Sequence, residues 1–262
     1  EDIRSYYLSN YSPSNATLIV VGDTSLEEVS KITDEYFGDW HFDGNHVDRV
    51  VETVSSNEDK QTSIYLIDKP GAAQTVIRCG FLGVERQHQD YFALLLFDHI
   101  FGGQFTSRLN TNLRQDKGYS YGYRSWIEWH RASSLFLIGG SVQTEVTLPA
   151  IQETLKEFQD AVSVRQVTDA EFQSAKASLI RHFPAFFETP SQILNSLGQG
   201  VSFNLPDDYY ENAIEQIQAV SLESVRKMPK KYFRSDKLML LVIGDRELIE
   251  ADLKSLKTPI AI

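Results

Sequence analysis

"GGQFTSRLNTNLRQDKGYSYGY", residues 102–123, is the most informative stretch of the chain. The double glycine at its start is typical of a helix end, because glycine tolerates the backbone geometry found there. The polar run after it has helical character and ends at Gly118. Tyr119, Tyr121 and Tyr123 then occupy alternate positions, which predicts that they share one face of a strand. The stretch therefore predicts a helix, a glycine break and a strand with a row of hydroxyl groups.

The elements around this stretch mix hairpins with helices. Strands are predicted at 62–68, 74–83, 119–131, 133–143 and 237–245, and helices at 90–103, 105–118, 148–162, 168–183, from 191, from 208 and at 246–256. Asp90 is predicted to cap one helix, and the pair Thr168 and Glu171 forms a capping box for another. Cys79, the single cysteine, lies in an apolar strand pattern and is interpreted as a small core residue. The pattern predicts an α+β fold with antiparallel or mixed sheets packed against helices.

An internal repeat suggests how the chain is organised. Residues 1–24 align without a gap with residues 223–246, so that Gly22-Asp23 matches Gly244-Asp245. Both copies are predicted to form a helix, a polar turn, a buried strand and another helix. The interpretation is that residues 1–45 are the C-terminal tail of a first half, residues 46–60 a linker and residues 61–262 a second half.

Composition excludes several classes of partner. The formal net charge is −11 at pH 7 and no basic block is present, so nucleic acid is not expected as a partner. The longest apolar run is too short to span a bilayer, so no transmembrane segment is expected. The compartment stays open, with the bacterial periplasm preferred to the cytoplasm. No histidine pair has the spacing of a helical zinc motif, and there is no pair of cysteines for a zinc knuckle.

The stretch at residues 102–123 resembles the second-half signature of the pitrilysin/insulinase family of zinc peptidases, which includes the mitochondrial processing peptidases. Ser107, Arg108 and Leu109, followed by Leu113 and Arg114, match the family's S-R-L-x-x-x-L-R helix. Tyr121 stands seven residues after Arg114, where the family has a tyrosine that opens a strand. The segments at 68–81, 11–23 and 27–40 also resemble the family, so the resemblance covers nearly the whole chain.

The resemblance implies a fragment of a two-halved peptidase. In such proteins, two homologous halves enclose a chamber, and each half has an antiparallel-rich sheet flanked by helices. The first half carries the zinc motif H-x-x-E-H. This chain lacks that region: its counterpart, residues 95–99, begins with Leu95, and His99 is interpreted as a structural histidine. No metal ligand is therefore assigned in this chain, and zinc is expected in the complete protein. The chain alone is predicted to be inactive.

The resemblance also gives Arg114 and Tyr121 a role. In the family, the matching tyrosine donates to the scissile carbonyl as it becomes an oxyanion, and the arginine holds the substrate backbone downstream. The structural alternative is that Arg114 opposes the dipole at a helix end and the tyrosines pack. Packing is favoured for Tyr119 and Tyr123, and the substrate role for Tyr121.

Two functions follow from this resemblance. The first is a peptidase fragment that supplies substrate-binding and transition-state-stabilising residues to a peptide-cleaving chamber. The second is a pseudopeptidase subunit, or a peptide-binding or structural module, without activity of its own. The expected partners are a peptide substrate, the zinc-bearing half or subunit and, through the exposed strand of residues 1–40, other copies of the chain.

Overall fold

The protein is described by a computed structural model that covers residues 1–41, 63–233 and 238–261. These residues group into two compact units. The first unit joins Glu1–Glu52 with His182–Tyr210, and the second joins Thr53–Arg181 with Glu211–Ile262. The predicted linker, residues 46–60, lies outside the described residues, and the predicted division into halves stays a prediction.

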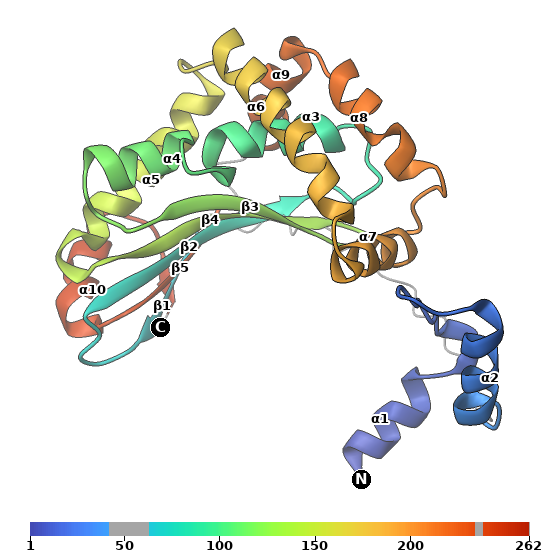
Figure 1. The fold of residues 1–262 in the computed structure, drawn as a ribbon. Helices are drawn as coiled ribbons and strands as arrows, with labels where there is room; N and C mark the ends of the chain where they lie inside the picture. Colours follow the sequence, from blue (N-terminus) through green and yellow to red (C-terminus); the bar gives the residue numbers. More distant parts are fainter. Residues whose placement is uncertain (42–62, 234–237, 262) are drawn as a thin grey trace. The chain divides into compact units, whose positions relative to one another are not determined.

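The second unit is built on one six-stranded sheet, which Figure 1 shows beneath a layer of helices. Its strands are β1 (Ser63–Asp68), β2 (Gln74–Gly83), β3 (Tyr123–Trp129), β4 (Ser134–Gln143), β5 (Met239–Gly244) and β6 (Ile260–Ala261). Their order is β3-β4-β2-β5-β1-β6. The pairs β3–β4, β4–β2 and β2–β5 are antiparallel, while β1 runs parallel to both β5 and β6. The predicted α+β fold with an antiparallel-rich sheet is confirmed.

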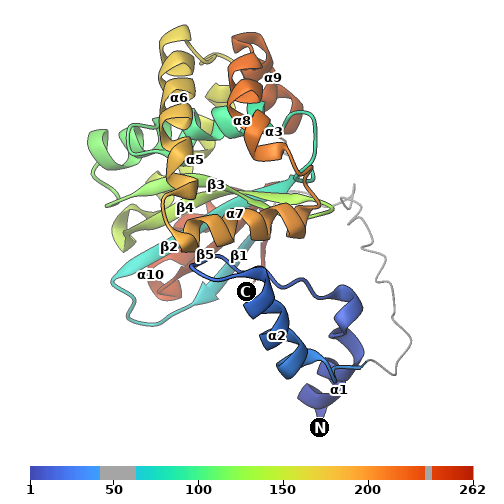
Figure 2. The ribbon, with the colours of Figure 1, turned by 45° about the vertical axis from the view of Figure 1, so that its right-hand side comes forward.

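Ten α-helices are described, together with short 3₁₀ and π segments. The α-helices are α1 (Asp2–Asn10), α2 (Leu26–Phe37), α3 (Tyr91–Asp98), α4 (Arg108–Asn110), α5 (Thr147–Val162), α6 (Asp169–His182), α7 (Pro190–Phe203), α8 (Tyr209–Ala219), α9 (Leu222–Tyr232) and α10 (Arg246–Lys254). The 3₁₀ segments are η1 (Pro13–Asn15), η4 (Thr144–Val146) and η5 (Phe183–Phe187), and the π segments are η2 (His99–Gly103) and η3 (Thr111–Asp116). Helices α3, α5, α6 and α9 lie on one face of the sheet (Figures 1 and 2).

The core lies between the sheet and these helices. Alternate residues of each strand face it, since side chains on a strand alternate between the two faces. Phenylalanine rings from strands and helices meet there: the Phe81 and Phe136 rings stack at 5.1 Å between centroids, and the Phe158 and Phe233 rings at 4.4 Å. Cys79 is buried in this core, and burial raises the pKa of its thiol to about 12. Its predicted role as a core residue is confirmed.

The two copies of the internal repeat have opposite burial. In β5, Leu240 and Val242 are 3% and 0% exposed, because the strand lies between β2 and β1. The matching Leu18 and Val20 are 59% and 48% exposed. Residues 16–21 form no strand in the structure, so the predicted buried strand is wrong for this copy. A strand needs neighbours for its backbone groups, and no described strand pairs with this segment.

Helix ends confirm one capping prediction and correct another. The Glu171 amide donates to Thr168 Oγ1 at 3.2 Å, and the Thr168 amide donates to the Glu171 carboxylate at 2.9 Å, so the predicted capping box is present. Asp90 stands at the N-cap of α3 but makes no side-chain capping bond. Its carboxylate instead accepts hydrogen bonds from Lys231 Nζ and Tyr232 Oη of α9, at 2.5 Å each.

Candidate functional site

A short helical segment, α4 followed by η3, carries most of the predicted site. Leu109 and Leu113 point into the core and are fully buried, which fixes the face that the segment turns toward the sheet. The predicted helix at 105–118 is shorter than expected and changes from α to π geometry at Thr111. It is followed by Gly118, whose φ of +67° is a conformation that favours glycine.

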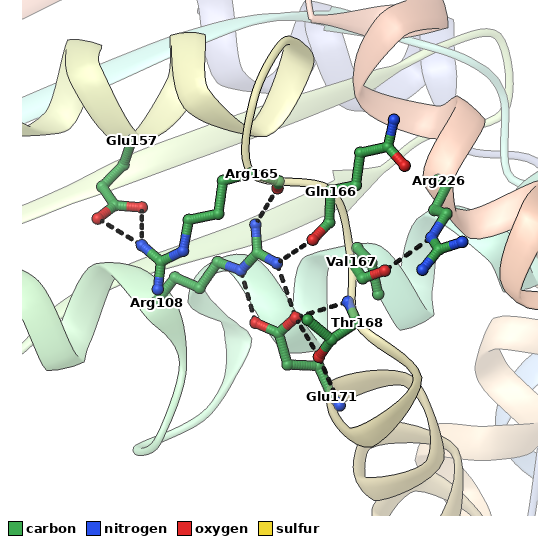
Figure 3. Close-up of polar contacts among 8 residues, drawn as sticks. All are labelled: Arg108, Glu157, Arg165, Gln166, Val167, Thr168, Glu171 and Arg226. Atoms are coloured by element: carbon green, nitrogen blue, oxygen red, sulfur yellow. Dashed lines mark hydrogen bonds and ion pairs between the residues drawn. The ribbon is translucent and has the colours of Figure 1, made fainter.

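Arg108 anchors the first turn of this segment (Figure 3). Its Nε and Nη2 atoms donate to the two carboxylate oxygens of Glu171 on α6, both at 2.7 Å. Its Nη1 and Nη2 atoms also donate to the carbonyls of Arg165 and Gln166, at 2.7 and 3.1 Å. The Arg108 side chain is 4% exposed, so it is a buried fork that ties α4 to the α5–α6 connection. It therefore serves as an anchor for the segment.

The ion pair sets the charge state of Glu171. Burial alone raises the pKa of the Glu171 carboxyl, but hydrogen bonds from Arg108 and Thr168 and the charge of Arg108 lower it to about 2. The opposing carboxylate is thus ionised at neutral pH and keeps both guanidinium bonds. The neighbouring connection is held in turn by Arg165, which donates to the Glu157 carboxylate at 3.0 Å, and by Arg226, which donates to the Val167 carbonyl at 2.7 Å.

Arg114 lies on η3, in the last turn of the segment, as predicted. Its guanidinium carbon lies 4.3 Å from the centroid of the Phe105 ring. A guanidinium that lies over an aromatic ring keeps its in-plane N–H groups available for a planar acceptor. Arg114 is half-buried, so its side chain contacts Phe105 and remains partly accessible. This stacking contact was not predicted from the sequence.

Tyr121 is the most exposed of the three neighbouring tyrosines. It is 90% exposed and lies in a turn just before β3. The turn is held by Ser120, whose Oγ donates to the Ser141 carbonyl at 2.7 Å and accepts from the Gly122 amide at 3.1 Å. Upstream, the Tyr119 amide donates to the Leu113 carbonyl at 2.9 Å. An exposed phenol is therefore held on a hydrogen-bonded turn that is also tied to the segment bearing Arg114.

The other two tyrosines pack, as predicted. Tyr123 is fully buried, and its hydroxyl accepts a hydrogen bond from Thr154 Oγ1 at 2.9 Å. Burial raises the pKa of the Tyr123 phenol. Tyr119 is partly buried against the same core. The predicted common strand face is wrong, because β3 begins only at Tyr123 and the turn at 120–122 directs Tyr121 to solvent.

Asn110 joins the pieces of the site, and sequence reasoning missed it. It is 2% exposed. Its Nδ2 donates to the Phe105 carbonyl at 2.7 Å, and its Oδ1 accepts from the Tyr123 amide at 3.2 Å. One buried amide therefore links the turn with Phe105, the segment with Arg114 and the strand that follows Tyr121. An asparagine in a polar helical run carries no sequence signal for such a role.

The described residues do not fit a zinc site. No group of three or more histidine, cysteine, aspartate or glutamate side chains is placed to hold a metal within residues 1–41, 63–233 and 238–261. At the counterpart of the zinc motif, Leu95 replaces the first histidine and the half-buried His99 starts η2. Asp98 beside it is buried and accepts a hydrogen bond from Ser125 Oγ at 2.5 Å. Burial raises the pKa of the Asp98 carboxyl to about 7, which the Ser125 bond only partly offsets.

The double glycine has a packing role at this place. A Cβ on Gly102 would overlap the backbone nitrogen and side chain of Ser125, so only glycine lets η2 approach β3 this closely. The predicted helix end at Gly102-Gly103 is confirmed, since η2 ends at Gly103. The residue pattern at the counterpart of the zinc motif is therefore accounted for by packing and one buried hydrogen bond.

Comparison with known proteins identifies the family of the chain. The family model described as "Peptidase M16 inactive domain" matches residues 1–179. The chain belongs to this family. The predicted relationship to the non-catalytic half of zinc metallopeptidases is thus confirmed.

Individual relatives of this M16 inactive domain are distant in sequence. It is 22% identical over 242 residues to the "Uncharacterized zinc protease YmxG" of Bacillus subtilis, covering 92% of this chain and 57% of that protein. It is 24% identical over 221 residues to the "Probable inactive metalloprotease YmfF" of the same species, covering 83% and 47%. The chain thus spans about half the length of the curated relatives that it matches.

Solved structures share the fold of this M16 inactive domain. A peptidase M16 inactive domain from Pseudomonas fluorescens aligns with a TM-score of 0.71 at 24% identity, covering 86% of this chain and 52% of that chain. A protease from Helicobacter pylori aligns with a TM-score of 0.77 at 19% identity, covering 92% and 58%. None of the helices in the described ranges is long and apolar enough to cross a membrane.

Proposed function

We propose that this chain supplies substrate-binding and transition-state-stabilising residues to the peptide-cleaving chamber of a zinc peptidase. The observation that carries the proposal is the contrast among the tyrosines. Tyr119 and Tyr123 pack against the core, whereas Tyr121 is 90% exposed on a turn fixed by hydrogen bonds. Packing accounts for the positions of Tyr119 and Tyr123, but it does not account for the exposed position of Tyr121.

In this proposal, the Tyr121 hydroxyl donates a hydrogen bond to the carbonyl oxygen of the bond being cleaved. The bond strengthens as negative charge develops on that oxygen, so it lowers the barrier more than it strengthens ground-state binding. The Arg114 guanidinium donates to backbone carbonyls of the peptide downstream. The zinc of the complete protein would be held by its other half, since the described residues of this chain do not fit it.

The test is steady-state kinetics of the complete protein on an unstructured peptide. Tyr121→Phe keeps the ring and removes the hydroxyl, so kcat should fall by roughly 10²–10³ with little change in melting temperature. The matched control is Tyr36→Phe, which removes a hydroxyl from a tyrosine that is 73% exposed on α2. Wild-type kcat in Tyr121→Phe would refute the proposed role.

A second candidate is a pseudopeptidase subunit or peptide-binding module without activity of its own. The names of two relatives favour it: the "Probable inactive metalloprotease YmfF" of Bacillus subtilis and the "Non-peptidase homolog YmxG" of Helicobacter pylori. The two candidates differ in the residues that precede Glu1 in the parent protein. An intact H-x-x-E-H motif there supports the peptidase, and its absence supports the subunit.

A further inference from the structure

Phe105 is the unexplained residue beside the proposed site. Its ring is 56% exposed, although the Arg114 guanidinium carbon lies 4.3 Å from its centroid. A large apolar ring that keeps more than half of its surface accessible beside a cation is placed for contact rather than for the core. Other rings lie in the core instead, such as those of Phe101 and Phe136, which are 0% and 2% exposed.

The position of Phe105 is fixed rather than incidental. Its carbonyl accepts the hydrogen bond from Asn110 Nδ2, and Asn110 is buried and also bound to the Tyr123 amide. The Ser107 amide closes the turn by donating to the Gln104 carbonyl at 3.1 Å. The ring therefore stands on a backbone that is joined both to the segment bearing Arg114 and to the strand after Tyr121.

We propose that Phe105 and Arg114 together form a subsite for an apolar side chain of the bound peptide. The Phe105 ring supplies apolar contact area for that side chain, and it holds the guanidinium flat so that its N–H groups face the adjacent peptide carbonyl. The subsite deepens the proposed function, on which it rests, by naming apolar residues on the Arg114 side of the cleaved bond as preferred.

Two consequences separate the roles of the two residues. Removing the ring removes both the apolar contact and the stacking, so it lowers affinity and erases the preference for an apolar side chain. Removing the cation lowers affinity but leaves the ring, so the preference stays. A residue that only supports the fold would change neither the preference nor the affinity of the folded protein.

The experiment measures peptide binding to the complete protein, with a chelator present to stop cleavage. The probes are labelled unstructured peptides in an alanine-serine background, in which one leucine is moved along the chain, with the leucine-free peptide as reference. In the wild-type protein, one leucine position should bind about tenfold more tightly than the reference, the low end of discrimination by an apolar site. In Phe105→Ala that ratio should fall to about one, and the reference peptide should bind about two- to fivefold more weakly through lost stacking.

The controls make each outcome decisive. Arg114→Ala should weaken the binding of all peptides and keep the leucine preference. Phe186→Ala, which removes a ring that is 44% exposed in the other unit, should change neither value. A leucine preference that persists in Phe105→Ala, or that is absent from the wild type, overturns the subsite. A preference lost in Phe105→Ala while Tyr121→Phe keeps full kcat supports the subsite and refutes the catalytic role of Tyr121.

Discussion

Arg108 and Glu171 form a two-pronged ion pair across 63 residues of sequence, with both donor–acceptor distances at 2.7 Å. The pair joins the segment that bears the candidate site to helix α6. The guanidinium also donates to the carbonyls of Arg165 and Gln166. One buried cation therefore joins α4, the α5–α6 connection and α6. Its removal is therefore expected to loosen the site as well as the fold.

We predict that Arg108→Leu destabilises the protein by about 3 kcal/mol, because it leaves the Glu171 carboxylate without its charged partner and two carbonyls without their donor. Arg108→Lys should recover only part of this, since an ammonium cannot make the paired bonds. Urea unfolding at neutral pH measures both variants. A loss no larger than that of an exposed pair, such as Lys227 with Glu223, would contradict the role of Arg108 as an anchor.

Acid should weaken the same pair. The folded pKa of Glu171, about 2, lies below its ordinary value of 4.5. The stabilisation is therefore present above pH 4.5 and is lost as the pH falls toward 2. We expect Arg108→Leu to reduce the acid dependence of unfolding in this window, which urea titrations at several pH values will show. An unchanged acid dependence would mean that other carboxylates determine it.

Asp98 should make stability depend on pH in the opposite direction. Its folded pKa, about 7, lies above the ordinary value of 3.8. Between these values the folded state binds a proton that the unfolded state has lost. Stability should consequently fall as the pH rises from about 4 to 7, by up to about 1.4 kcal/mol per pH unit. Asp98→Asn, a neutral side chain of the same shape that still accepts from Ser125, should lack this slope. An equal slope in both proteins would refute the assignment.

For Arg114, the variants should separate binding from turnover. A guanidinium that clamps the peptide backbone acts in the ground state as well, so Arg114→Ala should raise KM and lower kcat/KM by about ten- to a hundredfold. Arg114→Lys should not restore the wild-type value. Steady-state kinetics of the complete protein provides the measurement, with a thermal melt for each variant. A normal KM in Arg114→Ala would exclude the clamp.

The structural control for the site is Tyr123→Phe. It removes a buried hydroxyl that shares a hydrogen bond with Thr154 Oγ1 at 2.9 Å, and the single hydrogen of Thr154 Oγ1 can then be donated to the Ala150 carbonyl at 2.7 Å. We expect a loss of about 1 kcal/mol in stability and almost no change in kcat. A fall in kcat as large as that of Tyr121→Phe would mean that the hydroxyl of Tyr121 has no special position.

The exposed copy of the repeat should cause self-association. Leu18 and Val20 are exposed apolar residues of a segment that pairs with no described strand. Changing both residues to serine should reduce association of the chain at high concentration. The control is Ile3→Ser, which changes a residue 87% exposed on α1. Sedimentation velocity over a concentration series gives the answer, and a wild-type chain that stays monomeric throughout would contradict the prediction.

The strands and most helices were predictable because their signals are local. Alternation along β2 and the Thr168–Glu171 capping box need only neighbouring residues. The prediction that the three tyrosines share one strand face was wrong. The Ser120 hydroxyl donates to the Ser141 carbonyl and holds a turn before β3, and the alternation of residues carries no signal for this bond. The predicted side-chain cap at Asp90 was wrong for a similar reason. The partners of its carboxylate, Lys231 and Tyr232, lie far away in the sequence.

The site was predictable only in part. Arg114 and Tyr121 followed from a family resemblance, not from their own spacing. The resemblance also included Arg108, but its partner Glu171 lies in a distant helix that sequence reasoning could not pair with it. Phe105 and Asn110 act through a ring contact and a buried amide, and neither leaves a pattern in a single sequence.

Because η3 is a π-helical turn, the number of residues in it determines where Arg114 lies. The Lys117 amide bonds back five residues, to the Asn112 carbonyl at 3.0 Å, and such a turn holds about one residue more than an α-helical turn. Loss of one residue between Thr111 and Leu113 would let the segment relax to a regular helix at little backbone cost. Arg114 lies inside this turn, so the same deletion would shift it by one position relative to the residues before the turn and carry its guanidinium off the Phe105 ring. A deletion that leaves folding intact would therefore disable the site, so the register of this helix is itself part of the site's definition.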